Sequence, residues 1–445
     1  MKKILILGAG LSSSSMIKYL LGHSEEHNWK VRVGDMSLEV AKRKIANHIN
    51  GEAIEFDIFN EKQRHDEIQK ADVVISMLPA RFHYLAAEKC VEFGKHMVTA
   101  SYVSKEIKAL HEQALAKNIL LLNEIGVDPG IDHMSAMKVI DEIKAKGGEM
   151  LSFKSSTGGL VAPEYDNNPW NYKFTWNPRN VVVAGQSVAQ YIDHGQLKYI
   201  PYHKLFTRTE KMSVLDLGEF EMYPNRDSLS YRETYGLENI PTLLRGTLRR
   251  SGYCAGWNVF VQLGATDDTY VVENSENMTY RDFINSFLPY DLNDTVEQKL
   301  AKYVGIDMKS ETMKRLEWLG IFEKHKIGLP NSTPAQILQK LLEEKWALGP
   351  EDKDMIVMQH QFDFRLKDKT KRITSSLVVK GQDTVHTAMS ITVGVPVAIA
   401  TKLLLTGKLT NRGVVVPIMK DVYEPVLKEL EQFGINFIEE EQDLD

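Results

Sequence analysis

Three features of this sequence predict an α/β protein built on a doubly wound parallel sheet. Short apolar runs without polar alternation recur in its first part, which is typical of strands buried on both faces of a parallel sheet. Segments with helical spacing of apolar residues follow several of these runs after short connections. A glycine turn, Gly8-Ala9-Gly10, directly follows the first run, Ile4–Leu7, and precedes a helical pattern.

The predicted elements of this sheet alternate along the chain. The predicted strands are Ile4–Leu7, Val31–Val33, Ala53–Phe56, Asp72–Pro79, His96–Ala100 and Ile119–Leu122. The predicted helices are Leu11–Leu21, Ser37–Asn47 and His83–Phe93, the last with Gly94 as its C-cap. In such sheets the ligand lies beyond the carboxyl ends of the strands. We therefore expect the segments that follow the strands to line one crevice.

Composition limits the class of protein. A chain of 445 residues predicts two or three domains. The contents of 43% hydrophobic and 26% charged residues are those of a soluble globular protein, and a net charge of −6 offers no footprint for nucleic acid or anionic membrane. No apolar run approaches ~18 residues, and Met1-Lys2-Lys3 leaves no room for a signal peptide. With only two cysteines, Cys90 and Cys254, we expect a reducing cytoplasm.

The character of the chain changes near residue 150. Further strands are predicted at Leu151–Thr157, Asn180–Ala184, around Leu248–Leu263, and as a hairpin at Asp354–Arg365 and Arg372–Lys380. Residues 280–346 are predicted to be mostly helical, and helical patterns return at Val385–Leu405 and Val422–Phe433. We therefore predict three parts. They are a nucleotide domain of residues 1–128 with a tail, 385–445, that packs back on it; an α+β substrate domain of residues 129–279 and 347–384 with an antiparallel or mixed sheet; and a helical insertion, 280–346.

A dinucleotide-binding fingerprint follows the first strand. Gly8 and Gly10 permit a tight turn and let the backbone approach a pyrophosphate, and the next helix would turn its N-terminus toward that phosphate. The third small position is Ser13 instead of glycine or alanine, and serine is still small enough for close helix–strand packing. The second strand ends at Asp35, whose carboxylate can accept hydrogen bonds from an adenosine ribose. These features predict a Rossmann-type domain.

Two constellations in the middle region carry arginine. The first is the polar turn Tyr223–Ser228, which contains Arg226. In the second, the side chains of Arg245, Thr247 and Arg249 would share one face of a strand. Arginine binds carboxylates through paired hydrogen bonds, so this row suits an anionic substrate with several carboxylates. A solvated strand face with structural salt bridges explains the same pattern equally well.

Two residues of the expected crevice are candidates for chemistry. Tyr102 follows a strand end, where its hydroxyl could reach the nicotinamide side or its ring could form a lid over the sheet. Asp128 precedes Pro129-Gly130 and a predicted helix from Ile131, so its alternative role is a helix cap. His133, in the first turn of that helix, is expected to be structural. The other histidines lack metal-ligand spacing, and no nucleophile elbow or P-loop occurs, so no metal is expected.

Several longer stretches resemble the L-glutamate-forming saccharopine dehydrogenases. They occur in the same order along essentially the whole chain, and they are Val98–Tyr102, Asp128–His133, Gly158-Gly159, Ala162–Glu164, Lys173–Trp176, Tyr223–Ser228, Arg245–Arg249 and Gly349–Met358. The chain is similar in particular to the dehydrogenase half of the animal bifunctional enzyme of lysine breakdown. The resemblance implies oxidation of saccharopine to glutamate and 2-aminoadipate 6-semialdehyde. The carbon beside the secondary amine would lose a hydride to the nicotinamide, and water would then cleave the imine.

The resemblance also implies roles for individual residues. Those implied to touch the cofactor are Gly8, Ala9, Gly10, Leu11, Ser12, Asp35, Asp57, Leu78, Ala100, Ser101 and Asp128. Those implied to touch saccharopine are Ser101, Tyr102, Asp128, Arg226, Arg245, Thr247, Leu248 and Arg249. Tyr102 and Asp128 would orient the amine or water and move protons. Many family members have cysteine where this chain has Thr157, so we expect no acid–base role at that position.

The residue after the second strand distinguishes the two cofactors. Fungal relatives carry arginine there and use NADP, whereas this chain has Gly34-Asp35-Met36, similar to the animal form. A carboxylate would repel a 2′-phosphate and accept hydrogen bonds from a 2′-hydroxyl, so we expect NAD. Arg32 and Lys42 are near enough in the sequence to leave NADP possible. By family analogy we expect a homodimer. A related opine or carboxynorspermidine-type reductase and a non-catalytic NAD(H) sensor stay open as alternatives.

Overall fold

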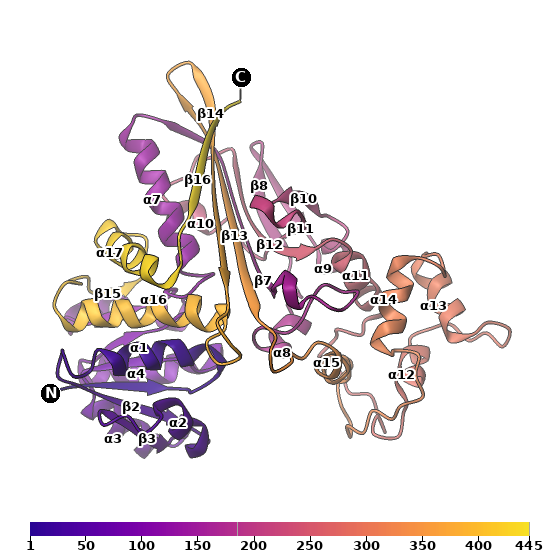
Figure 1. Cartoon of the computed structure of the whole chain (residues 1–445), viewed down its shortest axis with the longest axis horizontal. Coiled ribbons are helices and arrows are strands. Elements are labelled where there is room, and N and C mark those ends of the chain that lie inside the picture. Colours follow the sequence, from indigo (N-terminus) through magenta and orange to yellow (C-terminus); the bar gives the residue numbers. More distant parts are fainter. Residues whose placement is uncertain (185, 445) are drawn as a thin grey trace. The chain divides into compact units, whose positions relative to one another are not determined.

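The computed structural model describes residues 1–184 and 186–444, which divide into two units (Figure 1). The first unit comprises Met1–Glu149 and Leu377–Ile438, and the second comprises Met150–Ser376 with the C-terminal residues from Glu439 onward. The units differ from the predicted parts at three boundaries, because the first unit runs to Glu149 instead of residue 128, its returning segment begins at Leu377 instead of residue 385, and it ends at Ile438. The helix after residue 128 belongs to the first unit because it packs on the returning tail, and the last residues belong to the second because they pair with its sheet.

The first unit is built on a seven-stranded sheet with the order β15-β6-β5-β4-β1-β2-β3 and parallel pairing throughout. Its strands are β1 (Lys2–Leu7), β2 (Trp29–Asp35), β3 (Gly51–Glu55), β4 (Val73–Ser76), β5 (His96–Val98), β6 (Leu120–Leu122) and β15 (Gly413–Val415). The predicted doubly wound parallel sheet is confirmed. Strand β15 was not predicted, because it contains only two apolar side chains after Gly413 and both are only partly buried.

Helices cover both faces of this sheet. Side chains from β1, β4, β5 and β6 form an apolar cluster with residues of α3 and α4 on one face. On the other face α1 lies beside α16 (Figure 1), where Ser15 N donates to Ser390 Oγ at 3.0 Å and a side chain on Gly394 would meet Met16. The helices of this unit are α1 (Ser14–Gly22), α2 (Leu38–Ile45), α3 (Glu61–Lys70), α4 (His83–Phe93), α5 (Lys105–Lys108), α6 (His111–Ala116), α7 (Ile131–Ala145), α16 (Ala388–Leu405) and α17 (Lys420–Leu430).

The tail folds back onto the nucleotide unit as predicted, except for its last residues. Besides α16, helix α17 contacts α7, where the Tyr423 hydroxyl donates to Asp141 at 2.7 Å. Helix α16 has 18 residues and a mean hydropathy of 1.8, so by length and composition alone it could cross a membrane. The prediction that no stretch is this long and apolar is therefore wrong. Since 83% of α16 is buried inside the protein, its composition is also that of a core helix.

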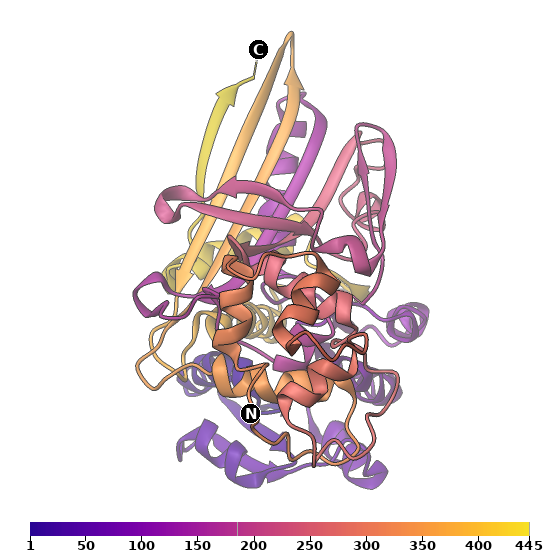
Figure 2. The same cartoon turned by 90° about the vertical axis from the view of Figure 1, so that its right-hand side faces the viewer.

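The second unit contains a nine-stranded mixed sheet with the order β10-β11-β12-β7-β13-β14-β16, to which β8 and β9 attach through β12. Strands β10, β11 and β12 pair antiparallel, and β12 pairs parallel with β7. The predicted hairpin is confirmed as β13 and β14, with β16 beside β14 (Figure 2). The strands are β7 (Glu149–Val161), β8 (Ala189–Asp193), β9 (Gln196–Ile200), β10 (Glu210–Ser213), β11 (Glu219–Pro224), β12 (Thr242–Arg250), β13 (Asp354–Leu366), β14 (Lys369–Lys380) and β16 (Ile438–Asp443).

The helical block predicted at residues 280–346 is confirmed, and three of its four helices begin with a threonine capping box. The helices of this unit are α8 (Pro178–Val182), α9 (Tyr202–Leu205), α10 (Tyr231–Thr234), α11 (Tyr253–Leu263), α12 (Tyr280–Ser286), α13 (Val296–Val304), α14 (Glu311–Leu319) and α15 (Pro334–Lys345). Two predicted strands are wrong. Asn180–Ala184 begins inside α8, and the strand predicted around Leu248–Leu263 ends at Arg250 and is followed by α11.

Candidate active site

The two glycines of the turn after β1 have different roles. Gly8 is required by the backbone conformation, and Gly10 borders open space. Gly8 has a φ of +101°, and a Cβ there would lie 2.7 Å from the carbonyl oxygen of Met77. A Cβ on Gly10 would meet nothing within 4 Å, and Leu11 is 68% exposed. Ser13 is buried, and its hydroxyl donates to the Gly10 carbonyl at 2.8 Å, so the serine fits as predicted. The open backbone beside a helix N-terminus fits a dinucleotide pyrophosphate.

Asp35 ties the end of β2 to this turn. Its Oδ2 accepts a hydrogen bond from Ala9 N at 2.8 Å, and its Oδ1 accepts one from Ser37 N at 2.9 Å. A carboxylate has further lone pairs, so Asp35 can also accept hydrogen bonds from a ribose. The structure therefore joins Asp35 to the turn of the predicted cofactor residues Gly8–Ser12 through Ala9.

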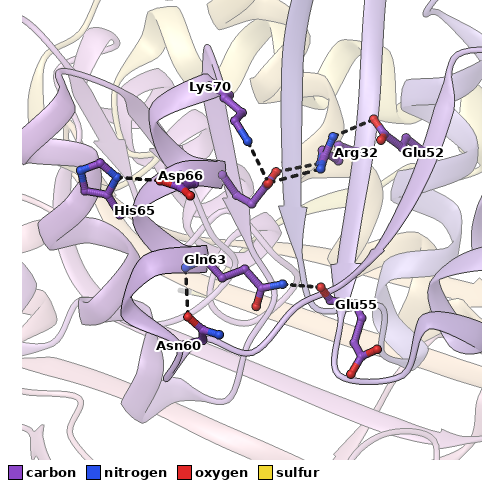
Figure 3. A network of polar contacts seen from close by, with 9 residues as sticks. Arg32, Glu52, Glu55, Asn60, Gln63, His65, Asp66 and Lys70 are labelled. Carbon is purple, nitrogen blue, oxygen red and sulfur yellow. Dashed lines mark hydrogen bonds and ion pairs between the residues drawn. The ribbon is translucent and has the colours of Figure 1, made fainter.

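The basic residues near the end of β2 are held in ion pairs. Figure 3 shows Arg32 of β2 beside carboxylates of β3 and α3, where it pairs with Glu52 at 2.9 Å and with Glu67 at 2.8 Å. Lys42 pairs with Glu39 on α2 at 2.9 Å, but this pair is exposed and contributes little. Arg32 would have to leave two carboxylates to bind a phosphate. The position of Arg32 close to Asp35 in the sequence is therefore only weak support for NADP binding.

The other predicted cofactor residues follow neighbouring strands of the same sheet. Asp57 follows β3, Leu78 follows β4, Ala100 and Ser101 follow β5, and Asp128 follows β6. The carboxylate of Asp57 accepts a hydrogen bond from Phe59 N at 2.9 Å, which is a local turn contact. Because all strands are parallel, these positions lie at the carboxyl edge of the sheet, where ligands of this fold bind.

A buried histidine links two of these strand ends, and the sequence analysis missed it. His83 opens α4 and is 2% exposed; its Nδ1 lies 2.7 Å from Ser76 Oγ and its Nε2 lies 2.6 Å from Ser101 Oγ. Burial lowers the pKa of His83 to about 4, so the imidazole is neutral at physiological pH. The sequence carries no signal for this contact, because the three residues are separate in the chain and join only through the order of β4 and β5.

The depressed pKa of His83 predicts how stability depends on pH. The unfolded chain binds a proton near pH 6.5, whereas the folded chain does so only near pH 4, so the free energy of unfolding falls as the pH drops through this window. By pH 5 the contribution of His83 to the free energy of unfolding has fallen by about 2 kcal/mol. We expect urea denaturation at pH 7 and at pH 5 to show that the free energy of unfolding decreases less in His83→Gln than in the wild type. Equal decreases would contradict the assignment to His83.

Tyr102 and Asp128 lie together. The Tyr102 side chain is 40% exposed, and its hydroxyl donates to Asp128 Oδ1 at 3.4 Å. Asp128 does not cap the next helix, because α7 begins after Gly130, and the carboxylate that accepts a hydrogen bond from Gly130 N at 2.6 Å belongs to Asp132. The capping alternative for Asp128 is therefore wrong, and the carboxylate faces a partly exposed hydroxyl instead.

A buried acid–histidine pair supports the segment that carries Tyr102. His133 is fully buried, with its Nε2 2.9 Å from Glu124 Oε2 and its Nδ1 3.7 Å from Asp132 Oδ2. The other carboxylate oxygen of Glu124 accepts a hydrogen bond from Val103 N at 3.0 Å. This burial agrees with the structural role expected for His133.

In the second unit, the two arginine constellations are neighbours. Asn225 N donates to the Arg245 carbonyl at 2.8 Å, and Tyr223 is the register partner of Thr247. Arg226 is exposed and has a φ of 29°. Arg245 and Arg249 are each only 5% exposed, and the Arg245 guanidinium lies 4.2 Å from the ring centroid of Tyr231. The alternative of a solvated strand face is therefore wrong. The predicted substrate residue Leu248 is fully buried, and its carbonyl oxygen accepts a hydrogen bond from Arg249 Nη1 at 2.8 Å.

Arg249 is enclosed by tyrosines. Its guanidinium lies 5.1, 6.0 and 5.3 Å from the ring centroids of Tyr172, Tyr223 and Tyr253, a set that the sequence analysis missed. Burial raises the pKa of all three hydroxyls, so they are neutral. The register partner Glu221 accepts hydrogen bonds from Gly252 N and Cys254 N at the start of α11. Within residues 1–184 and 186–444, Arg249 has no acidic partner, and its Nε has no hydrogen-bond partner.

Thr157 lies beside this group. It is the register partner of Thr247 on the parallel strand β7, and its Oγ1 is buried without a hydrogen-bond partner in the described part of the chain. A threonine hydroxyl can donate or accept a hydrogen bond to a ligand, but it does not ionise near neutral pH. The geometry is therefore consistent with a binding role at this position. Among the residues that the structure describes, no group of three or more His, Cys, Asp or Glu side chains is placed to hold a metal.

Comparison with known proteins identifies the family. The model of the saccharopine dehydrogenase NADP binding domain matches residues 4–122, and that of the saccharopine dehydrogenase C-terminal domain matches residues 126–435. The chain belongs to the saccharopine dehydrogenase family. It is 32% identical to the saccharopine dehydrogenase [NADP(+), L-glutamate-forming] of Pyricularia oryzae, over 98% of both chains. Family membership confirms the resemblance inferred from sequence motifs.

Two further relatives define the extent of the likeness. The chain is 33% identical over 98% of its length to the mitochondrial alpha-aminoadipic semialdehyde synthase of Mus musculus, but it spans only 47% of that protein. The structure of saccharopine dehydrogenase (L-Glu forming) from Saccharomyces cerevisiae matches with a TM-score of 0.89 and 30% identity, over 99% of this chain and 100% of the yeast chain. The chain thus spans about half of the mouse relative and nearly all of the fungal ones.

Proposed function

We propose that this chain catalyses the NAD-dependent oxidation of saccharopine to glutamate and 2-aminoadipate 6-semialdehyde. The observation that carries the proposal is the buried Arg249 guanidinium, which has no carboxylate partner in the described residues. A buried charge without a counter-ion is unfavourable, and an anionic ligand would relieve it. Saccharopine has three carboxylates. Arg249 would bind one of them, and Arg245 and the exposed Arg226 are candidates for the others.

The first unit supplies the groups suited to the reacting centre. A bound nicotinamide dinucleotide would accept the hydride. Asp128 would accept a proton from the secondary amine or from the water that adds to the imine, and Tyr102 would orient this carboxylate through its hydroxyl. Thr157 would hydrogen-bond substrate without transferring a proton, because its hydroxyl does not ionise near neutral pH.

The choice of NAD rests on Asp35. The names of the fungal relatives and of the matched domain specify NADP. In this chain the carboxylate of Asp35 stands at the end of β2, where it would repel a 2′-phosphate, and Arg32 is engaged by Glu52 and Glu67. These contacts support NAD, in agreement with the expectation from sequence. The family resemblance also leads us to propose a homodimer, which light scattering of the purified protein would test. The low number of cysteines, Cys90 and Cys254, leads us to propose a cytoplasmic location.

A spectrophotometric assay tests the proposed function. We expect saccharopine to produce reduced cofactor at 340 nm, with kcat/KM for NAD at least about tenfold above that for NADP. The products should be glutamate and an aldehyde, both detectable by mass spectrometry. Turnover only in the reverse direction with an aldehyde and a diamine would favour the related reductase. NAD binding without turnover of saccharopine or other opines would favour a sensor.

A further inference from the structure

Ser76, His83 and Ser101 are linked by two hydrogen bonds whose donors and acceptors can be assigned. His83 is neutral, so one ring nitrogen carries a hydrogen and the other accepts one. Ser76 is fully buried, and within residues 1–184 and 186–444 its hydroxyl contacts only His83 Nδ1, at 2.7 Å. If Nδ1 carried the hydrogen, the Ser76 proton would be buried without an acceptor. The favoured tautomer therefore has Ser76 donating to Nδ1 and the hydrogen on Nε2.

This tautomer sets the orientation of the Ser101 hydroxyl. Nε2–H donates to Ser101 Oγ at 2.6 Å, so the hydroxyl proton of Ser101 points away from the imidazole. Ser101 is half-buried at the end of β5, and its backbone is held on both sides, because its N–H donates to Thr99 Oγ1 at 3.3 Å and its carbonyl accepts from Glu124 N at 3.0 Å. Ser101 is therefore presented as a hydrogen-bond donor in a fixed position.

We propose that His83 is a positioning residue that makes Ser101 a donor to a carboxylate oxygen of saccharopine. The inference rests on the proposed function and deepens it by naming the substrate group that Ser101 binds. The reacting amine is the poorer acceptor, because a hydrogen bond to its lone pair would oppose the departure of hydride from the neighbouring carbon. Ser76 acts one step further away by holding His83 in the required tautomer.

Nuclear magnetic resonance of the intact protein, labelled with ¹⁵N in histidine, tests the tautomer directly. We expect the His83 signals, assigned through their loss in His83→Asn, to show the hydrogen on Nε2 and no titration between pH 8 and pH 5.5. We expect Ser76→Ala to shift His83 toward the other tautomer, because Nδ1 then loses its donor. A hydrogen on Nδ1 in the wild type would overturn the proposal.

Steady-state kinetics test the consequence for the substrate. We expect Ser101→Ala and His83→Asn each to raise the KM for saccharopine about tenfold, the effect of one lost hydrogen bond to a charged group, with KM for NAD within about twofold. Because His83 acts through Ser101, the double variant should be no worse than Ser101→Ala alone. His83→Gln should recover part of the loss, since its amide nitrogen lies near the position of Nε2.

The control and the contrary outcomes separate this inference from the proposed function. His96→Asn alters another histidine of the same unit at the opposite end of β5, where Nδ1 accepts a hydrogen bond from Leu120 N, and it should leave both KM values unchanged. No turnover of saccharopine by the wild type would defeat the proposed function. Normal turnover with additive effects of the two substitutions, or a rise in KM for NAD instead of saccharopine, would overturn only the role of His83.

Discussion

Replacing Arg249 with methionine should raise the KM for saccharopine by about 10²- to 10³-fold and leave the KM for NAD unchanged. The expected loss corresponds to about 3–4 kcal/mol, within the range measured when one partner of a buried, hydrogen-bonded charge pair is removed. The large effect follows from burial, since the guanidinium is 5% exposed and the surrounding tyrosines exclude water that would weaken its attraction for a carboxylate.

Arg250 is the matched control for this substitution. It is the next residue on β12, so its side chain leaves the opposite face of the strand. It donates to the Leu217 carbonyl at 2.6 Å and lies 4.3 Å from the ring centroid of Phe220. Arg250→Met should therefore reduce stability modestly without changing KM for saccharopine. Arg249→Lys should stay impaired by at least about tenfold, because lysine cannot form the paired hydrogen bonds of a guanidinium.

Thermal denaturation distinguishes lost binding from lost folding in Arg249→Met. Because the buried charge has no acidic partner in the described chain, we expect the variant without ligand to be at least as stable as the wild type. Saccharopine should raise the Tm of the wild type and not that of the variant. If the variant kept a normal KM, the proposal that Arg249 binds a substrate carboxylate would be wrong.

The sequence predicted the nucleotide unit well because its signals are local. The central strands β1, β4, β5 and β6 each contain a continuous apolar run, and the turn at Gly8 to Gly10 is a contiguous motif. The second unit was predicted less well. At Asn180 the β-branched valines suggested a strand, but Asn177 and Pro178 begin a helix whose cap outweighs that propensity. Tyr253–Leu263 is buried and apolar almost all round, so periodicity could not separate a helix from a strand.

The candidate site also contains residues that the sequence identifies and residues that only the tertiary structure brings together. Asp35, Tyr102 and Asp128 were identified because each directly follows a strand or precedes a helix in a recognisable motif. The tyrosines around Arg249 come from three separate segments, and only the pairing of β11 with β12 and the packing of α11 bring them together. Motifs predict which residues bind, whereas the environment that determines how strongly they bind depends on tertiary packing.

Replacing Asp35 with serine and Met36 with arginine should reverse the preference from NAD to NADP. Asp35 stands at the end of β2, and its carboxylate is joined to the phosphate-binding turn through Ala9 N. At about 4 Å and an effective dielectric constant of about 20, one pair of unit charges interacts by about 4 kcal/mol, so removing the repulsion and adding a cation should each change affinity by about 10²-fold or more. We expect kcat/KM for NADP to rise and that for NAD to fall by about 10²-fold.

Single substitutions separate the effect of charge from the effect of structure. Asp35→Asn keeps the shape but loses the charge and one of the two acceptors for Ala9 N and Ser37 N, so it should weaken NAD binding and relax the discrimination against NADP. Glu55→Gln removes the same charge from the register partner on β3 and should have little effect on either cofactor, because Glu55 is exposed and water screens its charge. A wild-type preference for NADP would show that the carboxylate at Asp35 does not determine cofactor choice.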